Sequence, residues 1–261
     1  MKADRVPGWA GCSIIRKECV DSTNEEAKRG GDAGAVHGTV YCAMSQTAGK
    51  GRRGRSWLSE TKGNLYFTLL LRPELDTDDV SMLTLVMAHA VAEAIIEKTG
   101  LQVSIKWPND IVINKKKVCG ILSEMKLEGE KCAYCIIGVG INIEQTAFPE
   151  ELQVMATSIK AELAGEQKVT PDELLQNILR IFEGTYEAVC EAGCLTPILE
   201  RYNELMVNKG KTVRVLEPGN EYEALATGIS PFGELLVVKD GKDLRRVYAG
   251  EVSVRGLYGY V

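Results

Sequence analysis

The sequence predicts an α+β protein, with strands and helices over residues 1–207 and a small β-barrel over residues 208–261. Three observations lead to this expectation. Apolar residues recur at helical spacing in Ser81–Thr99, and several runs rich in Ile and Val are typical of strands. Near Asn208 the chain changes to short strands separated by turns, which is typical of a small barrel.

The first predicted helix opens in DSTNE, where Ser22 and Glu25 form a capping box, and it should stop at Gly30-Gly31. Two strands follow, Thr39–Gln46 and Asn64–Leu71, with a loop rich in glycine and arginine between them.

The helix Ser81–Thr99 should end at Gly100, because glycine favours the left-handed cap position. A second capping box at Thr170, with proline next to it, starts a helix that runs to about Cys190, and a shorter helix follows Pro197. Strands are predicted at Ser104–Trp107, Ile111–Ile113, Val118–Met125 and Ala133–Ile143, with an Asn114-Lys115 turn after the second and a break at Gly138 and Gly140 in the last. The barrel strands are TVRVL, Tyr222–Ile229, ELLVV and GEVSVRG, with a hairpin turn at Asp240-Gly241.

The composition is that of an ordinary globular chain, 45% hydrophobic and 26% charged, with a net charge of -5 and a pI near 5.3. Any cationic cluster is therefore local, and a general affinity for nucleic acid is disfavoured. The longest apolar runs, such as Leu65–Leu71, are too short to span a bilayer, and the N-terminus has no apolar region typical of a secretory signal. We expect a cytoplasmic protein that does not bind membranes.

The cysteines predict no special chemistry. Cys132 and Cys135 form a C-x-x-C pair, but no second pair lies at zinc-ligand spacing, and the only histidines are His37 and His89. The pair also lies in a predicted buried strand, so we expect reduced thiols that behave as small apolar side chains. Two histidines also disfavour a His-dependent hydrolase or a multi-His metal site.

The loop GKGRRGRSW, Gly49–Trp57, begins with a match to the dinucleotide fingerprint G-x-G-x-x-G. A strand rather than a helix follows it, which excludes the Rossmann interpretation, and Met44 and Gly51 break the Walker A pattern. Glycine amides and clustered guanidinium groups do suit a compact, multiply charged anion such as a nucleotide triphosphate. The alternative is a basic turn that faces solvent.

Three further segments carry similar signals. Lys106–Asp110 places polar groups at the end of a short strand, Lys115–Lys117 precedes Gly120, and Gly138 and Gly140 leave one side of a strand without side chains. Each has a structural alternative: a turn, a solvated lysine run and a bulge, respectively.

Five motifs together resemble the biotin–protein ligase family over essentially the whole chain. They are DSTN at Asp21, QTAGKGRRGRSW at Gln46, KWPND at Lys106, KVCGIL at Lys117 and GVGINI at Gly138, and the terminal AGEVSVRG resembles that family's C-terminal barrel. The resemblance implies a class II synthetase-like catalytic domain at 1–207, with a mixed, largely antiparallel sheet and flanking helices, and an SH3-like barrel at 208–261. The segment before DSTN is too short for the DNA-binding domain of longer members, so we expect a ligase-only protein without specific DNA binding.

The resemblance also implies roles for individual residues. Ser22, Thr23 and Gln46 would hydrogen-bond the ureido ring of biotin, Lys117 would bridge the biotin carboxylate and the α-phosphate of ATP, and Asn142 would reach the nucleotide. Gly120 and Gly138 would line the biotin tail, Trp57 would pack near adenine, and Asn109 and Asp110 would lie by the phosphates and the metal ion. Binding residues are expected to be Ser22, Thr23, Asn24, Gln46, Gly49, Lys50, Gly51, Arg52, Arg53, Gly54, Arg55, Trp57, Asn109, Lys117, Gly120, Ile121, Gly138 and Asn142, with Lys117, Arg52 and Asp110 catalytic and Asp110 a ligand of Mg²⁺.

One position departs from the family pattern. Lys50 stands where arginine is more usual, which keeps the charge but loses the two-pronged donor.

The implied reaction has two steps: biotin and ATP give biotinyl-5′-AMP, and a lysine of a biotin carboxyl carrier domain of a biotin-dependent carboxylase then takes the biotin. Asp110 is the candidate that orients or deprotonates this lysine, and closure of the loop would protect the anhydride from water. The alternatives are a lipoate–protein ligase of the same fold and a nucleic-acid-binding module, which the acidic pI disfavours. A homodimer is compatible with the sequence.

Overall fold

A seven-stranded sheet dominates the computed structural model, which describes residues 8–59, 62–74, 79–163, 168–217, 220–249 and 253–256. The strand order is β1-β2-β3-β7-β6-β5-β4. Only the β1–β2 pair is parallel, so the expected mixed, largely antiparallel sheet is confirmed. The strands are β1 (Ser13–Val20), β2 (Thr39–Gln46), β3 (Leu65–Leu71), β4 (Val103–Lys106), β5 (Asp110–Ile113), β6 (Lys116–Glu128) and β7 (Lys131–Ile141).

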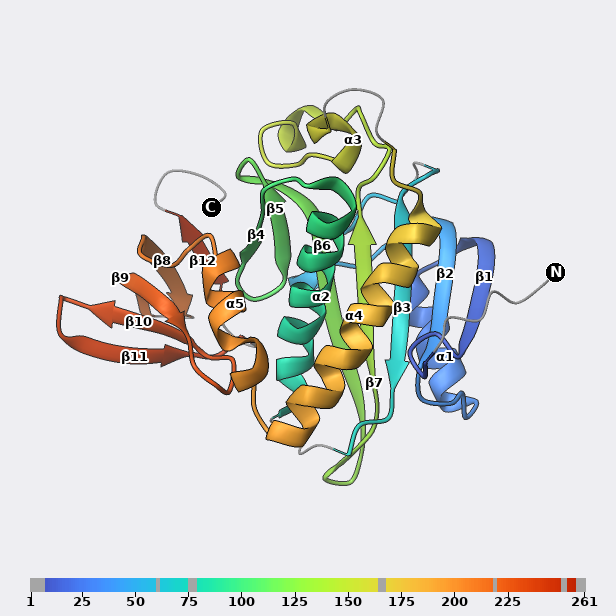
Figure 1. Ribbon diagram of the computed structural model, residues 1–261, viewed down its shortest axis with the longest axis horizontal. Coiled ribbons are helices and arrows are strands. Elements are labelled where there is room, and N and C mark those ends of the chain that lie inside the picture. The colour runs from blue at the N-terminus through green and yellow to red at the C-terminus, as the bar shows by residue number, and fades with distance from the viewer. Residues whose placement is uncertain are drawn as a thin grey trace.

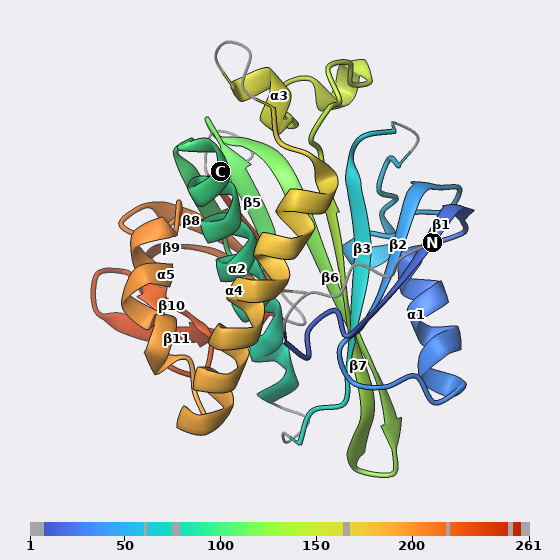
Figure 2. The same cartoon turned by 45° about the vertical axis from the view of Figure 1, so that its right-hand side comes forward.

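Helices cover the two faces of the sheet unequally (Figures 1 and 2). Leu69, Leu71 and Ile137 point into the main core, beneath the long helices α2 and α4. Their neighbours Leu70 and Ile136 point the other way, into a small cluster under α1, because successive strand residues face opposite sides. The helices are α1 (Thr23–Asp32), α2 (Met82–Thr99), α3 (Ile159–Glu162), α4 (Pro171–Ala192) and α5 (Leu199–Leu205).

The C-terminal part is a five-stranded antiparallel sheet in the order β11-β10-β9-β8-β12. The predicted turn is confirmed, with positive φ at Asp240 and Gly241. Trp107 donates its indole N–H to the carbonyl of Gly233 at 3.0 Å, and Val213 and Leu235 join the main core. Closure into a barrel and a domain boundary at 207/208 stay predictions. The strands are β8 (Thr212–Glu217), β9 (Asn220–Ile229), β10 (Leu235–Lys239), β11 (Asp243–Val247) and β12 (Ser253–Gly256).

Helix α1 begins as predicted but ends later. Ser22 is the N-cap and accepts from the amide of Asn24 at 3.2 Å, while the Glu25 side chain pairs with Lys28 and Lys50 instead of closing a capping box. The predicted stop at Gly30-Gly31 is wrong, because the helix continues to Asp32.

The two glycines of α1 serve packing rather than termination. A Cβ at Gly30 would lie 1.6 Å from the hydroxyl of Tyr41, and one at Gly31 would lie 2.8 Å from the ring of Tyr134. Both rings come from strands beneath the helix, so the missing side chains let α1 approach the sheet.

Most other predicted helices and strands are present, with boundaries shifted by a few residues. The capping box at Thr170 is present, and Gly100 takes the left-handed cap with φ of 68°. The predicted break at Gly138 and Gly140 is wrong, since β7 runs through both and pairs with β3 and β6. Strand β1, helix α3 and the short 3₁₀ turns were not predicted. No helix in the described part of the chain is long and apolar enough to cross a membrane.

Candidate functional site

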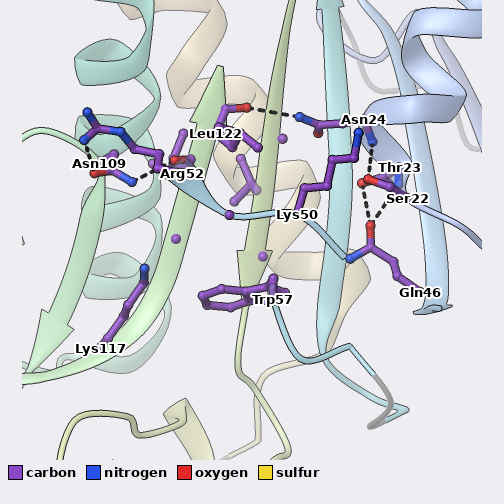
Figure 3. A pocket seen from close by; sticks show the side chains of 16 residues that line it. Ser22, Thr23, Asn24, Gln46, Lys50, Arg52, Trp57, Asn109, Lys117 and Leu122 are labelled. Carbon is purple, nitrogen blue, oxygen red and sulfur yellow. Dashed lines mark hydrogen bonds between the residues drawn. The ribbon is translucent and has the colours of Figure 1, made fainter. Parts of the chain in front are cut away.

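A pocket opens on the α1 face of the sheet, where the helix no longer covers the strands (Figure 3). Along β7, Ile136 lies under α1, whereas Gly138 and Gly140 follow on the same face without side chains. On β6 their partners are Leu122 and Gly120. Glycines on two adjacent strands therefore form the floor of the pocket and leave space above the sheet. The pocket is lined by Ser22, Thr23, Asn24, Gln46, Lys50, Gly51, Arg52, Trp57, Asn109, Lys117, Gly120, Ile121, Leu122, Gly138, Val139 and Gly140.

One end of the pocket is polar and tightly ordered. Gln46 Oε1 accepts from the backbone amide of Thr23 at 2.8 Å and from its hydroxyl at 3.2 Å. Thr68 donates to the hydroxyl of Thr23 at 2.9 Å or to Oδ1 of Asn24 at 2.7 Å. Ser22, Thr23 and Asn24 are each at most 5% exposed, and their hydrogen bonds fix the donors and acceptors in place.

The opposite end is cationic (Figure 3). Lys117 on β6 forms an ion pair with Asp110 on β5, with Nζ 2.6 Å from Oδ1. Arg52 donates to Oδ1 of Asn109 at 2.9 Å, and Asn109 donates to the carbonyl of Ile121 at 2.9 Å. Burial lowers the pKa of Arg52, an effect that the nearby Asp110 carboxylate opposes. This end can attract and orient an anion.

The glycine-arginine loop joins the two ends. Its backbone closes on itself, with the amide of Gly51 bonded to the carbonyl of Arg55 at 2.7 Å and that of Trp57 bonded to the carbonyl of Gly49 at 2.9 Å. Arg53 has φ of 57° and Gly54 has φ of 70°, the left-handed conformation that a sharp turn requires. The loop therefore crosses the pocket as a defined turn.

Trp57 packs on the glycine floor. A Cβ at Gly140 would lie 2.4 Å from Nε1 of Trp57, and one at Gly120 would lie 2.9 Å from its Cζ3. Lys117 Nζ lies 5.2 Å from the centroid of the indole. The indole N–H is buried and has no hydrogen-bond partner among the described residues.

Most of the predicted site residues meet in this pocket. Leu122, Val139 and Gly140 also line it. Gly140 was expected, with Gly138, to leave one side of the strand free but was not among the predicted binding residues, and Leu122 and Val139 were not predicted. Outside the lining are Gly49, Arg53, Gly54, Arg55, Asp110 and Asn142, of which Arg53, Gly54 and Arg55 are exposed parts of the loop.

Asn142 makes a hydrogen bond within the protein. Its side chain is 5% exposed and donates to the carbonyl of Thr157 at 3.0 Å. A direct role with nucleotide stays a prediction.

Cys132 and Cys135 are free thiols in the structure. Burial raises the pKa of both Cys132 and Cys135, which keeps the thiols protonated, and both lie on β7. The described residues also contain no group of three or more His, Cys, Asp or Glu side chains that could hold a metal ion.

A mixed sheet with a glycine-floored pocket, polar at one end and cationic at the other, defines a protein that brings a small polar molecule next to an anion. The match to known families agrees with this class. Residues 17–142 match the biotin/lipoate A/B protein ligase family, and residues 210–255 match the biotin protein ligase C-terminal domain.

Relatives cover nearly the whole chain. The bifunctional ligase/repressor BirA of Bacillus subtilis is 35% identical over 94% of this chain and 74% of its own length. The biotin–(acetyl-CoA-carboxylase) ligase of Paracoccus denitrificans is 30% identical over 83% of this chain and 90% of its own. The biotin protein ligase from Aquifex aeolicus in complex with biotin and ATP superposes with a TM-score of 0.80 at 30% identity, covering 94% and 99% of the two chains. The chain belongs to the biotin protein ligase family.

Proposed function

We propose that this protein joins biotin to ATP to form biotinyl-5′-AMP and then transfers the biotin to a lysine of a carrier protein. The observation that carries the proposal is the single pocket in which an ordered polar end and a cationic end share a floor of glycines. The polar end suits the ureido ring, the floor suits the apolar tail, and the cationic end suits a carboxylate beside a phosphate.

The first step needs no general base, because the biotin carboxylate is already an ionised nucleophile. It attacks the α-phosphorus of ATP, a bond to the bridging oxygen breaks, and pyrophosphate leaves. What the step requires is alignment and cancellation of the repulsion between two anions. Lys117 and Arg52 supply positive charge at that point, and Asp110 holds the Lys117 ammonium in position at 2.6 Å.

The cationic end could hold Mg²⁺ only together with the phosphates of ATP. Magnesium is commonly bound by one or two carboxylates together with substrate phosphates and water. Asp110 would supply the carboxylate, but its Oδ1 is paired with Lys117 and the amide oxygen of Asn109 is paired with Arg52, so phosphates and water would have to supply most of the ligands. When bound, the ion would neutralise phosphate charge. The protein's own residues still have to orient the reactants.

Asp110 is proposed to act again in the second step, where the acceptor ammonium must lose a proton before it attacks the anhydride. We expect Asp110→Asn to slow transfer from preformed biotinyl-5′-AMP at least about tenfold, a modest share of what general-base catalysis supplies. Single-turnover transfer to a carrier domain measures this directly. Transfer at the wild-type rate would remove Asp110 from this role.

The loop is proposed to retain the reactive anhydride. Arg52→Ala is expected to raise the escape of biotinyl-5′-AMP about tenfold, because the guanidinium that spans Asn109 and the carbonyl of Ala249 is lost. Labelling of bystander lysines reports the escape. Arg52→Lys should give labelling between that of the wild type and that of Arg52→Ala, because lysine keeps the positive charge. Arg180→Ala, on the surface of α4, is the matched control. Equal labelling by all variants would contradict the proposal.

The acceptor is proposed to be the biotin carboxyl carrier domain of a biotin-dependent carboxylase, as the names of the relatives suggest. We further propose a cytoplasmic protein. We also propose that it does not bind nucleic acid specifically, which its net charge of -5 supports. A homodimer stays a proposal that sedimentation would test.

The decisive experiment is ATP–pyrophosphate exchange with biotin, lipoate and octanoate compared side by side. We expect exchange with biotin alone. Exchange that prefers lipoate or octanoate would assign the protein to the other branch of the matched family, and no exchange with any of the three would overturn the proposal.

A further inference from the structure

The side chain of Lys50 is directed at helix α1 rather than at the cationic end of the pocket (Figure 3). Its ammonium forms an ion pair with Oε1 of Glu25, and the same oxygen accepts from Lys28 at 3.0 Å. The Lys50 and Glu25 side chains are 43% and 29% exposed, so the pair is at the surface but partly screened from water. A single carboxylate oxygen thus ties the loop to the first turn of α1.

Further contacts connect the Glu25–Lys50 pair to the polar end of the pocket. Lys28 Nζ lies 2.6 Å from Oε1 of Glu124 on β6. The other oxygen of Glu124 accepts from Nδ2 of Asn24 at 2.8 Å, and Asn24 lines the polar end. Lys50 is therefore linked to a pocket residue by alternating charges on α1 and β6.

The other side of the loop has its own attachment. Arg52, two residues after Lys50, donates to Asn109 and to the backbone carbonyl of Ala249. The loop is consequently held at one side by α1 and at the other by the turn before β5 and by the C-terminal part. Between these attachments it crosses the glycine floor.

We infer that Glu25 is a positioning residue that fastens the loop over the pocket through Lys50. The Glu25–Lys50 pair, called the latch below, sets how long the loop stays closed on its ligand. Lysine suffices at position 50 because the partner is one carboxylate oxygen, which needs a compact charge and not a two-pronged donor. The inference rests on the proposed function in one respect, since the enclosed ligand is taken to be biotinyl-5′-AMP.

The expected effect is modest and measurable. Exposed ion pairs are weak, so loss of the latch should open the loop about three- to fivefold more often rather than unfold it. Glu25 does not line the pocket. Its removal should therefore change retention of the adenylate and leave the rate of pyrophosphate exchange at saturating substrate near that of the wild type.

A double-mutant cycle tests the latch. Glu25→Gln, Lys50→Gln and the double variant are loaded with biotinyl-5′-AMP, and its dissociation is followed after dilution. Each single variant should release the adenylate three- to fivefold faster, and the double variant should be no faster than either. Glu26→Gln is the matched control, because Glu26 is the next residue of α1 and pairs with Lys17 and Arg29, away from the loop.

Three results of this cycle would overturn the inference. One is release at the wild-type rate from either single variant. The second is a double variant whose effect is the product of the two singles, which would mean that Lys50 contacts the ligand independently of Glu25. The third is equal acceleration by Glu26→Gln, because that change alters the charge of α1 without touching the latch.

A second measurement does not depend on activity. Trypsin cleavage of the ligand-free protein after Arg53 and Arg55, both exposed in the loop, should be several-fold faster in Glu25→Gln and unchanged in Glu26→Gln. Unchanged cleavage in Glu25→Gln overturns the latch. Absent pyrophosphate exchange in the wild type with a positive cleavage result would instead overturn the proposed function alone.

Discussion

Replacing Lys117 with alanine is expected to lower kcat/KM for biotin-dependent pyrophosphate exchange about 100- to 1000-fold, the usual loss when one group aimed at developing charge is removed. Lys117 lies at the cationic end, 2.6 Å from Asp110 and over the Trp57 indole. Without it, the biotin carboxylate and the α-phosphate would meet with their repulsion uncompensated. ATP–pyrophosphate exchange at several biotin concentrations measures the loss.

The neighbour Lys116 provides the control. It precedes Lys117 on β6, carries the same charge and does not line the pocket, so Lys116→Ala should leave exchange unchanged. The melting temperature of Lys117→Ala should also fall, because the change leaves the mostly buried carboxylate of Asp110 without its ammonium partner, so exchange is compared at a temperature where the variant is folded. Near-normal exchange by a folded Lys117→Ala protein would show that another group joins the two reactants.

Gly138→Ala is expected to raise the KM for biotin about tenfold or more. A Cβ at this position would lie 1.9 Å from Oδ1 of Asn24. Asn24 cannot simply turn aside, since Thr68 holds its oxygen at 2.7 Å and Glu124 holds its nitrogen at 2.8 Å. The methyl group must break these buried hydrogen bonds or displace β7, and either disturbs the polar end.

Steady-state kinetics with varied biotin measures the change, and Gly184→Ala is the control. Gly184 lies in α4, where an added Cβ meets nothing within 4 Å, so that substitution should leave the KM unchanged and slightly stabilise the helix. Combining Gly138→Ala with Asn24→Ala removes the clash. If the double variant is worse than Asn24→Ala alone, the effect does not pass through Asn24.

Elements with local chemical signals were predictable from the sequence. Thr170 with Glu173 specifies a helix start, Gly100 specifies a helix end, and Asn114-Lys115 takes the positive φ values of a tight turn. Each signal depends on residues a few positions apart, so the rest of the fold does not alter its meaning. The individual strands were predictable in the same way, whereas the mixed, largely antiparallel sheet was expected from the family resemblance.

Errors arose where a residue's partner is distant in sequence. Gly30-Gly31 looks like a helix end, but Tyr41 and Tyr134 occupy the space of the missing side chains. Strand β1 is an edge strand with mostly exposed residues, so it lacks the alternation that marks a half-buried strand.

In the candidate site, too, residues with local sequence signals were predicted and contacts between distant residues were not. The glycines, Lys117 and the loop arginines were recognisable because their spacing is local and matches a family pattern. The partner of Lys50 was not, because Glu25 lies on a helix 25 residues earlier and nothing in either segment names the other. The pairing of Lys50 with Glu25 could be identified only from the folded structure.

The contact between Arg52 and position 249 uses a main-chain oxygen. Any residue at 249 supplies the same acceptor, so the composition of this stretch can drift through evolution while the loop keeps its support. A deletion or insertion that shifts the backbone there would remove the acceptor, whereas a simple exchange of side chain would not. Comparing related chains letter by letter would consequently miss this attachment, and comparing their lengths in this stretch would reveal it.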